Sequence, residues 1–130
     1  MADTMSWDAA KCLVQAVEDA FGAADLAAGL ERIARKTDAF IAVSNGPNDI
    51  LFLEGRKLCQ LPVFAIDAVD TLGAGDAFHG GFVLALAEGR SEVEAMRFGA
   101  AVAGIKCSRI GGSAGSPTRA EVEAFLAGRP

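Results

Sequence analysis

Three small residues and one acidic residue precede a segment whose apolar residues have the spacing of a helix. Gly73, Ala74 and Gly75 precede Asp76, and apolar residues then recur at helical spacing as far as Ala87. The first N–H groups of a helix have no partner inside it, and they lie at the positive end of the helix dipole. Residues 73 to 75 therefore predict an anion site made of backbone amides, which glycine leaves open to a bulky phosphate.

Asp76 lies at the edge of this predicted site. A carboxylate there repels a resting phosphate, but it can accept the proton of a hydroxyl that attacks the phosphoryl group. The same residue also fits a structural cap, because acidic residues begin many helices. His79 follows one turn later, where an ion pair with Asp76 is geometrically possible, but we expect a packing or surface role for it.

The composition predicts one folded domain over residues 1–130, with residues 1–8 flexible. Hydrophobic residues make up 52% of the chain and charged residues 22%, and no apolar run approaches the ~18 residues needed to cross a bilayer. The net charge of −5 disfavours nucleic acid and anionic membranes as partners. An anionic ligand must therefore be held by local dipoles or by a metal ion.

The cysteines and the N-terminus indicate a cytoplasmic protein. The three cysteines, Cys12, Cys59 and Cys107, have no CxxC spacing and stand in apolar surroundings. We therefore expect buried free thiols in a reducing compartment. The first residues lack the basic and apolar regions of a secretory signal peptide.

The first half of the chain predicts helices followed by short strands. A helix is expected over 8–21 and another after Asp25, with Leu26, Leu30 and Ile33 on one face. The apolar run 39–44 predicts a buried parallel strand, and 45–49 has the composition of a turn. The remaining elements are a hairpin formed by 50–53 and 57–61, and an extended segment over 62–69.

The second half predicts two capped helices joined by a glycine loop. Ser91 with Glu94, and Thr118 with Glu121, have the spacing of capping boxes. The first of these helices carries an apolar stripe that we expect to face inward: Val93, Met96, Ala100, Ala103 and Cys107.

The glycine loop follows over 110–117, and it fits either a flexible connection or a ligand loop. Lys106 and Arg109 precede it, where either could contact phosphate or lie at a solvated helix end. No Gly-x-x-x-x-Gly-Lys-Ser/Thr occurs, which excludes a Walker-type loop.

The stretch from Asp70 to Phe82, DTLGAGDAFHGGF, closely resembles the C-terminal signature of the ribokinase-like (PfkB) carbohydrate kinases, including ketohexokinases and fructokinases. The resemblance implies an α/β fold, with a mainly parallel sheet flanked by helices, as in the C-terminal half of the ribokinase-like fold. It implies ATP-dependent phosphoryl transfer to a sugar hydroxyl, with ATP and Mg²⁺ as cofactors. By the same resemblance Gly73, Ala74 and Gly75 form the anion hole, and Asp76 is the catalytic base.

Further positions follow from the resemblance alone. Gly46 corresponds to a segment near the ribose and phosphates of ATP, although Asp49 stands where related kinases have a second glycine. The helix 97–107 resembles the adenine-side helix of ketohexokinase-like members, which assigns Ala103 and Cys107 to the nucleotide.

The glycine loop also has a counterpart in the family. The resemblance assigns Gly112 to the nucleotide. It also implies a monovalent cation such as K⁺ at Asp70 and Leu72, held together with the part of the loop that begins at Gly111 and ends at Ser116.

The resemblance covers roughly residues 25 to 127, which correspond to only the C-terminal portion of a family member. Two hypotheses follow. The chain is the nucleotide-binding part of a carbohydrate kinase, or it is a noncatalytic module that binds nucleotide or associates with a partner. In either case we expect a homo-oligomer, because the faces that the rest of the kinase would cover are left apolar.

Overall fold

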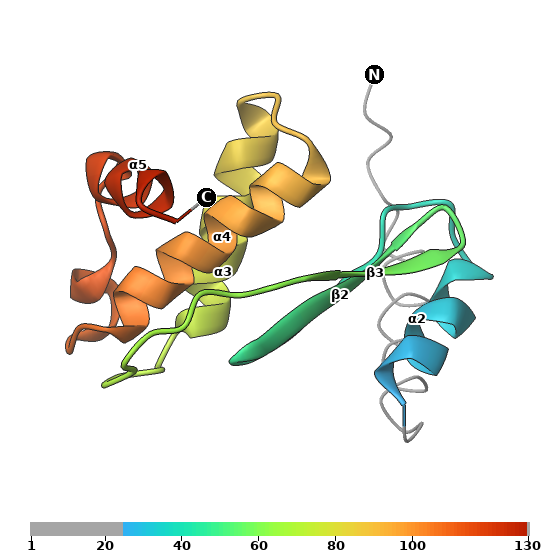
Figure 1. Ribbon diagram of the computed structural model, residues 1–130, viewed down its shortest axis with the longest axis horizontal. Coiled ribbons are helices and arrows are strands. Elements are labelled where there is room, and N and C mark those ends of the chain that lie inside the picture. The colour runs from blue at the N-terminus through green and yellow to red at the C-terminus, as the bar shows by residue number, and fades with distance from the viewer. Residues whose placement is uncertain (1–24, 130) are drawn as a thin grey trace. The chain divides into compact units, whose positions relative to one another are not determined.

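The computed structural model describes residues 25–129, which form two compact units with the boundary between Leu61 and Pro62 (Figure 1). The helix predicted over 8–21, the flexible segment predicted over 1–8 and Cys12 lie outside the described residues. Within residues 25–129 no helix is both long and apolar enough to span a membrane. One domain over the whole chain stays a prediction.

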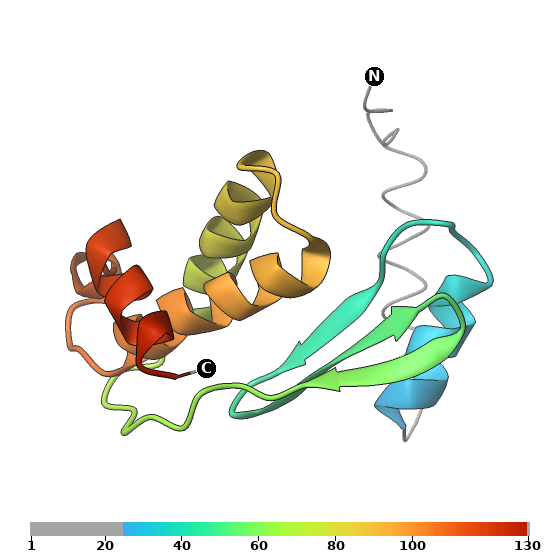
Figure 2. The ribbon, with the colours of Figure 1, turned by 45° about the horizontal axis from the view of Figure 1, so that its top comes forward.

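The first unit consists of a helix and three strands. Helix α2 covers Leu26–Ala34, and the strands β1, β2 and β3 cover Ala42–Asn45, Asn48–Glu54 and Lys57–Leu61. The sheet order is β1-β2-β3 (Figure 2). Two residues separate the strands at each hairpin, and glycine occupies the first position of both turns, with φ 56° at Gly46 and 63° at Gly55. These left-handed backbone angles favour glycine over any residue with a Cβ.

Helix α2 forms as predicted and contributes to the core of this unit. Its first turn is capped by Asp25, whose carboxylate accepts the N–H of Ala27 at 3.0 Å. Leu30 and Ile33 are buried, whereas Leu26 is half-buried. Strand β2 contributes the other buried side chains of this unit, Ile50, Phe52 and Leu53. The helical spacing of the apolar residues therefore identified the packed face of α2 correctly.

The orientation predicted for the apolar run 39–44 is wrong. Strand β1 begins at Ala42 and pairs antiparallel with β2, which pairs antiparallel with β3. A parallel pair needs a long crossover connection, and the Gly46-Pro47 turn is too short to provide one. Burial also differs from the prediction, because Val43 is half-buried and Phe40 is 39% exposed. The mainly parallel sheet is thus not found among the described strands.

The second unit is helical. Helix α3 covers Ala74–Ala87, α4 covers Glu92–Cys107, a short 3₁₀ helix η1 covers Gly112–Gly115, and α5 covers Arg119–Ala127. Both capping boxes are confirmed. Ser91 Oγ accepts the N–H of Glu94, and the Glu94 carboxylate accepts the N–H of Ser91 at 2.9 Å. Thr118 and Glu121 form the same reciprocal pair.

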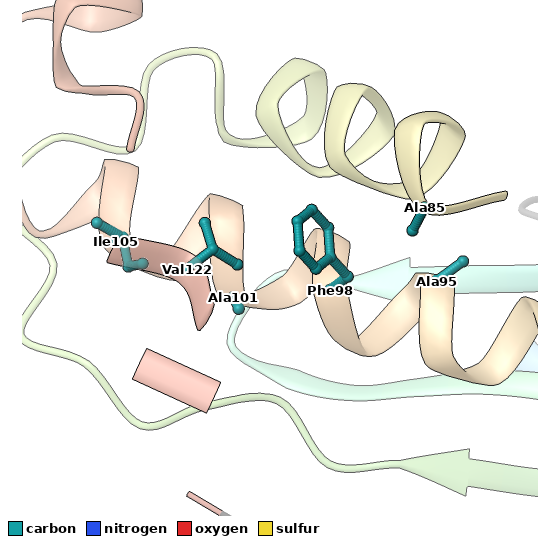
Figure 3. Packing of buried hydrophobic residues seen from close by; sticks show 6 residues of the cluster. All are labelled: Ala85, Ala95, Phe98, Ala101, Ile105 and Val122. Atoms are coloured by element: carbon teal, nitrogen blue, oxygen red, sulfur yellow. The ribbon is translucent and has the colours of Figure 1, made fainter. Parts of the chain in front are cut away.

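Helix α4 lies at the centre of this unit, and its buried surface is wider than predicted. Met96, Ala100 and Cys107 are buried as expected, whereas Val93 and Ala103 are only half-buried. Burial extends around the helix because α3, α5 and the extended segment 62–70 all pack on it. Figure 3 shows Ala85 of α3 facing α4, within the core cluster of Ala85, Ala95, Phe98, Ala101, Ile105 and Val122.

Glycines allow α3 and α4 to approach closely. A Cβ on Gly99 would lie 2.7 Å from the backbone oxygen of Phe78, which is closer than real Cβ contacts allow. A Cβ on Gly104, in the same helix, would lie 3.5 Å from Ile66 Cγ2, which is an ordinary contact. The two glycines of α4 therefore differ in whether the packing requires them.

We predict that Gly99→Ala lowers the free energy of unfolding by about 1–2 kcal/mol, because overpacking outweighs the gain in helix propensity. The matched control Gly104→Ala should leave stability unchanged or raise it by up to about 1 kcal/mol. Urea unfolding of both variants measures the difference. Equal stabilities would contradict the close approach of α3 and α4.

An ion pair joins the end of α4 to the last helix. Arg109 donates to the Glu121 carboxylate at 2.5 Å, and Glu121 also accepts the N–H of Thr118 at 2.7 Å. The Arg109 guanidinium, followed by the Thr118 backbone and hydroxyl, lowers the pKa of Glu121 from 4.5 to about 2. Arg109 thus lies at a partly exposed helix end, where it pairs with Glu121, and a contact with phosphate stays a prediction.

A carboxyl with a lowered folded-state pKa stabilises the fold above its unfolded pKa, and this contribution is lost as the pH falls through the folded pKa. We therefore predict that Glu121→Gln is less stable than the unmodified chain at neutral pH. The difference should shrink as the pH falls from 4.5 towards about 2. Thermal unfolding across this range is the measurement.

The matched control for this test is Glu123→Gln, which removes the same charge from the same helix. Glu123 makes only a 3.6 Å pair with Arg119 along α5, so its replacement should have a smaller effect. If the loss of stability in Glu121→Gln did not change with pH, it would come from altered packing or capping and not from the lost charge.

Candidate anion-binding site

Helix α3 begins at the glycines, as predicted. Gly73 is its N-cap residue, with φ 74°, and no side chain caps the helix. This left-handed conformation favours glycine, so Gly73 lets the chain turn directly from residues 70–72 into the helix. The first helical residue is Ala74, which lies between the two glycines of the turn.

The backbone N–H groups at this end are not all available. Ala74 donates to Thr71 O at 3.1 Å, and Ala77 donates to Gly73 O at 2.9 Å. In the described part of the chain, the N–H groups of Gly73, Gly75 and Asp76 have no acceptor. A Cβ built on Gly75 has no atom within 4 Å, so the space before these amides is open. The free amides at this end of α3 are thus those of Gly73, Gly75 and Asp76, whereas the amide of Ala74 is occupied.

The Asp76 side chain makes no capping bond. It is exposed, and it has no hydrogen bond or ion pair to any residue of 25–129. The possible pair with His79 does not form, because the His79 Nδ1–H donates to Gly75 O at 2.7 Å. His79 is exposed, which agrees with the surface role expected for it. Asp76 therefore presents a free carboxylate beside the open amides.

Asp70 connects the signature to the glycine loop. Its Oδ1 accepts the N–H of Leu72 at 3.0 Å, and its Oδ2 accepts those of Gly111 and Gly112 at 3.2 and 3.4 Å. These three backbone bonds, with a smaller contribution from Lys106, lower the pKa of Asp70 to about 2. The structure therefore brings together Asp70, Leu72 and Gly112, three residues assigned to the site from sequence.

Lys106 has a role that the sequence analysis missed. Its side chain is buried, Nζ donates to Asp70 O at 2.8 Å, and Nζ lies 3.5 Å from Asp70 Oδ1. Both roles suggested from sequence, a phosphate contact and a solvated helix end, are wrong. The available signal was its place between Ile105 and Cys107 in an apolar helix, where a buried ammonium needs an anionic partner.

Cys107 holds the signature through its backbone. Its carbonyl accepts the N–H of Val69 at 2.8 Å and that of Asp70 at 3.2 Å. The Cys107 thiol is free and buried, and Cys59 in the first unit is free and half-buried. Ala103 lies one turn earlier on α4 and is half-buried. Gly46 lies in the β1–β2 turn of the other unit, so its role at a nucleotide stays a prediction.

The oxygens of Asp70, one of the residues assigned to a monovalent cation, are already engaged by protein donors. Both carboxylate oxygens of Asp70 are engaged, and its backbone oxygen accepts from Lys106. Leu72 is 75% exposed, and its N–H faces the Asp70 carboxylate. Among the described residues no group of three His, Cys, Asp or Glu side chains could hold a metal ion.

The glycine loop assigned to the same cation differs from the prediction at its far end. Ala114 donates to Gly111 O at 3.0 Å, and Ser116 donates to Ser113 O at 3.1 Å, so these two loop carbonyls are engaged within the loop itself. Ser116 is exposed and makes no hydrogen bond to Asp70, which the loop contacts only through its first two residues. The short 3₁₀ helix η1 separates Ser116 from those residues. Asp70 and Ser116 are therefore not brought together by a direct bond.

Sequence relatives of this chain are carbohydrate kinases. The chain is 38% identical over 88 residues to the ribokinase of Bacillus subtilis, in an alignment that spans 68% of this chain and 30% of that enzyme. The chain therefore corresponds to less than a third of the length of that relative.

Solved structures give the same result. The ribokinase of Thermotoga maritima superimposes with a TM-score of 0.78 at 35% identity, over 90% of this chain and 40% of that one. The Arabidopsis thaliana ribokinase complexed with ribose and ATP gives a TM-score of 0.69 at 29% identity, over 75% of this chain and 32% of that one. These similarities confirm the ribokinase-like α/β fold predicted from the signature, of which this chain forms part.

The family assignment rests on a match that covers most of the chain. Residues 11–119 match the model of the pfkB family carbohydrate kinases. This range includes the anion site at the start of α3, the free Asp76 carboxylate and the Asp70–Lys106 pair. The chain belongs to the pfkB family of carbohydrate kinases.

Proposed function

We propose that this chain is the nucleotide-binding and anion-hole part of an ATP-dependent sugar kinase. The observation that supports this most directly is the set of free N–H groups at Gly73, Gly75 and Asp76, beside the Asp76 carboxylate, which has no partner among residues 25–129. A site that only bound phosphate would gain nothing from the negative charge of Asp76. A site that transfers phosphate to a hydroxyl needs a group to accept the proton of that hydroxyl.

The chemistry divides between the amides and the carboxylate. The open N–H groups of α3 bind the oxygens of the transferred phosphoryl group and stabilise their charge. The sugar oxygen forms a bond to the γ-phosphorus, the bond from that phosphorus to the β-phosphate oxygen breaks, and ADP leaves. Asp76 accepts the hydroxyl proton late, because a sugar hydroxyl is far too weak an acid to lose it beforehand.

Mg²⁺ enters this proposal with the nucleotide. It neutralises phosphate charge, and it commonly binds through phosphates and one or two carboxylates rather than in a cage made of protein ligands. That mode fits the absence of a cluster of three ligating side chains among the described residues.

The nucleotide contacts at Gly46, Ala103, Cys107 and Gly112 are part of the same proposal. Support for them comes from the family and from the Arabidopsis ribokinase, whose structure is complexed with ribose and ATP. Cys107 and Gly112 contribute at least indirectly, because both hold Asp70 through backbone groups.

The sugar is set by subtype within the family. The sequence of helix 97–107 supports a ketohexokinase- or fructokinase-like member, whereas the relatives described above are ribokinases. Turnover measured with a panel of ketoses and aldoses distinguishes these subtypes.

A second candidate function is a noncatalytic module that binds nucleotide or self-associates. The apolar side chains exposed on α3 favour it: Val83 is 61% exposed, Leu84 46% and Leu86 37%. Such side chains support a homo-oligomer in either function. The free thiols Cys59 and Cys107 support a cytoplasmic location.

We predict that Gly75→Val abolishes or strongly weakens binding of ATP and inorganic phosphate, because the side chain would occupy the open space before the amides. Calorimetric titration is the measurement. The matched control is Gly80→Val in the same helix, since a Cβ at Gly80 also has no atom within 4 Å. Gly75→Val and Gly80→Val lose the same backbone freedom, but only Gly75 lies beside the free amides. If both variants weakened binding equally, these amides would not be the anion-binding site.

We predict that Asp76→Asn lowers kcat by about 10²–10⁴, the usual contribution of general-base catalysis, while ATP affinity stays the same or improves. Asn keeps the size of the side chain and removes the base. The control is Asp67→Asn, an exposed carboxylate of the extended segment. Steady-state assays with ATP, Mg²⁺ and the sugar panel measure both.

Near-normal turnover by Asp76→Asn would exclude Asp76 as the catalytic base. Turnover of a sugar by the unmodified chain would exclude the noncatalytic module.

A further inference from the structure

We propose that the Lys106 ammonium is the permanent cation at the Asp70 junction, so that the anion site of this chain does not use a monovalent metal ion. This inference concerns the same site as the proposed function and rests on it for its catalytic consequence. It opposes the expectation of K⁺ at Asp70 and Leu72 that the family resemblance implied.

Three backbone N–H groups and the Lys106 ammonium surround the Asp70 carboxylate. A carboxylate offers about four acceptor positions on its two oxygens. Oδ1 accepts the N–H of Leu72 at 3.0 Å and faces Lys106 Nζ at 3.5 Å, and Oδ2 faces the N–H groups of Gly111 and Gly112 at 3.2 and 3.4 Å. A metal ion would have to approach this carboxylate beside three N–H donors and an ammonium.

The backbone oxygen of Asp70 could also act as a ligand for a cation at this junction. It accepts a hydrogen bond from Lys106 Nζ at 2.8 Å. The ammonium therefore lies against two oxygens of one residue, which is the arrangement of a bound cation.

Charge and access also favour the ammonium over a metal ion. Lys106 is 1% exposed, and its position in the last turn of α4 places its charge near the negative end of the helix dipole. A metal ion at Asp70 would meet the repulsion of this ammonium in a partly desolvated site. The ammonium is also tethered to the protein, so it competes with a free ion at a high effective concentration.

The turn into the anion site should therefore keep its geometry in any salt. The Asp70 carboxylate holds the N–H of Leu72, the residue directly before Gly73, and Lys106 holds Asp70. Lys106 is thus a positioning residue for the amides of α3, and it takes the place of a dissociable cofactor.

The test compares salts at equal ionic strength. Thermal unfolding midpoints of the unmodified chain should be the same in KCl, NaCl and tetramethylammonium chloride. A saturable rise of several degrees with K⁺, absent with Na⁺ and tetramethylammonium, would overturn the proposal, because it would reveal a K⁺ site that stabilises the folded state.

A variant tests whether the ammonium fills the site. Lys106→Met keeps the length of the side chain and leaves Asp70 without a cation, so its midpoint should fall and should rise again with K⁺ more than with tetramethylammonium. The control Arg109→Met breaks the neighbouring pair with Glu121, and its loss should be independent of the cation. If Lys106→Met does not fold, the salt series on the unmodified chain decides.

ATP affinity separates this inference from the proposed function. Equal affinity in KCl and in tetramethylammonium chloride supports the Lys106 proposal, and a K⁺-dependent affinity overturns it. No ATP binding in either salt would contradict the proposed function, and the unfolding series would then decide the Lys106 proposal on its own.

Discussion

The ion pair between Asp70 and Lys106 is the interaction on which the site depends. It joins the end of the central helix α4 to the first residue of the signature, and the same carboxylate holds the glycine loop through Gly111 and Gly112. A buried ammonium without its partner is strongly destabilising, so neither residue can change alone without cost. The amides at the start of α3 are therefore positioned by contacts made a few residues before them in the chain.

Local signals predicted the helical parts of the structure well. Both capping boxes and the start of α3 at the glycines depend on residues within four positions of one another, and all of them form. The hairpin around Gly55 was predicted for the same reason, although Glu54 belongs to β2 and the turn has two residues rather than three. In these elements the residues that set the conformation lie close together in the sequence, so the sequence alone shows the contacts.

The features that could not be predicted depend on distant residues. The direction of β1 is fixed by its pairing with β2, whereas an apolar run alone does not distinguish a parallel strand from an antiparallel one. The burial of α4 exceeds the predicted stripe because three different segments cover it. Lys106 looked like a surface residue because its partner Asp70 lies 36 positions away along the chain. At the candidate site, the free amide of Asp76 and the occupied amide of Ala74 likewise required the geometry of the turn.

The sequence separation of that pair also bears on the order of folding. Helices α3 and α4 are consecutive and pack closely, so their contacts close only a short loop, whereas Asp70 meets Lys106 and the glycine loop only after the whole helical hairpin has formed. We expect the candidate anion site to form late during folding and to be among the first parts lost when the fold opens locally. Amide hydrogen exchange at Leu72, Gly111 and Gly112 would then report on the opening of the site itself, at a free energy below that of global unfolding.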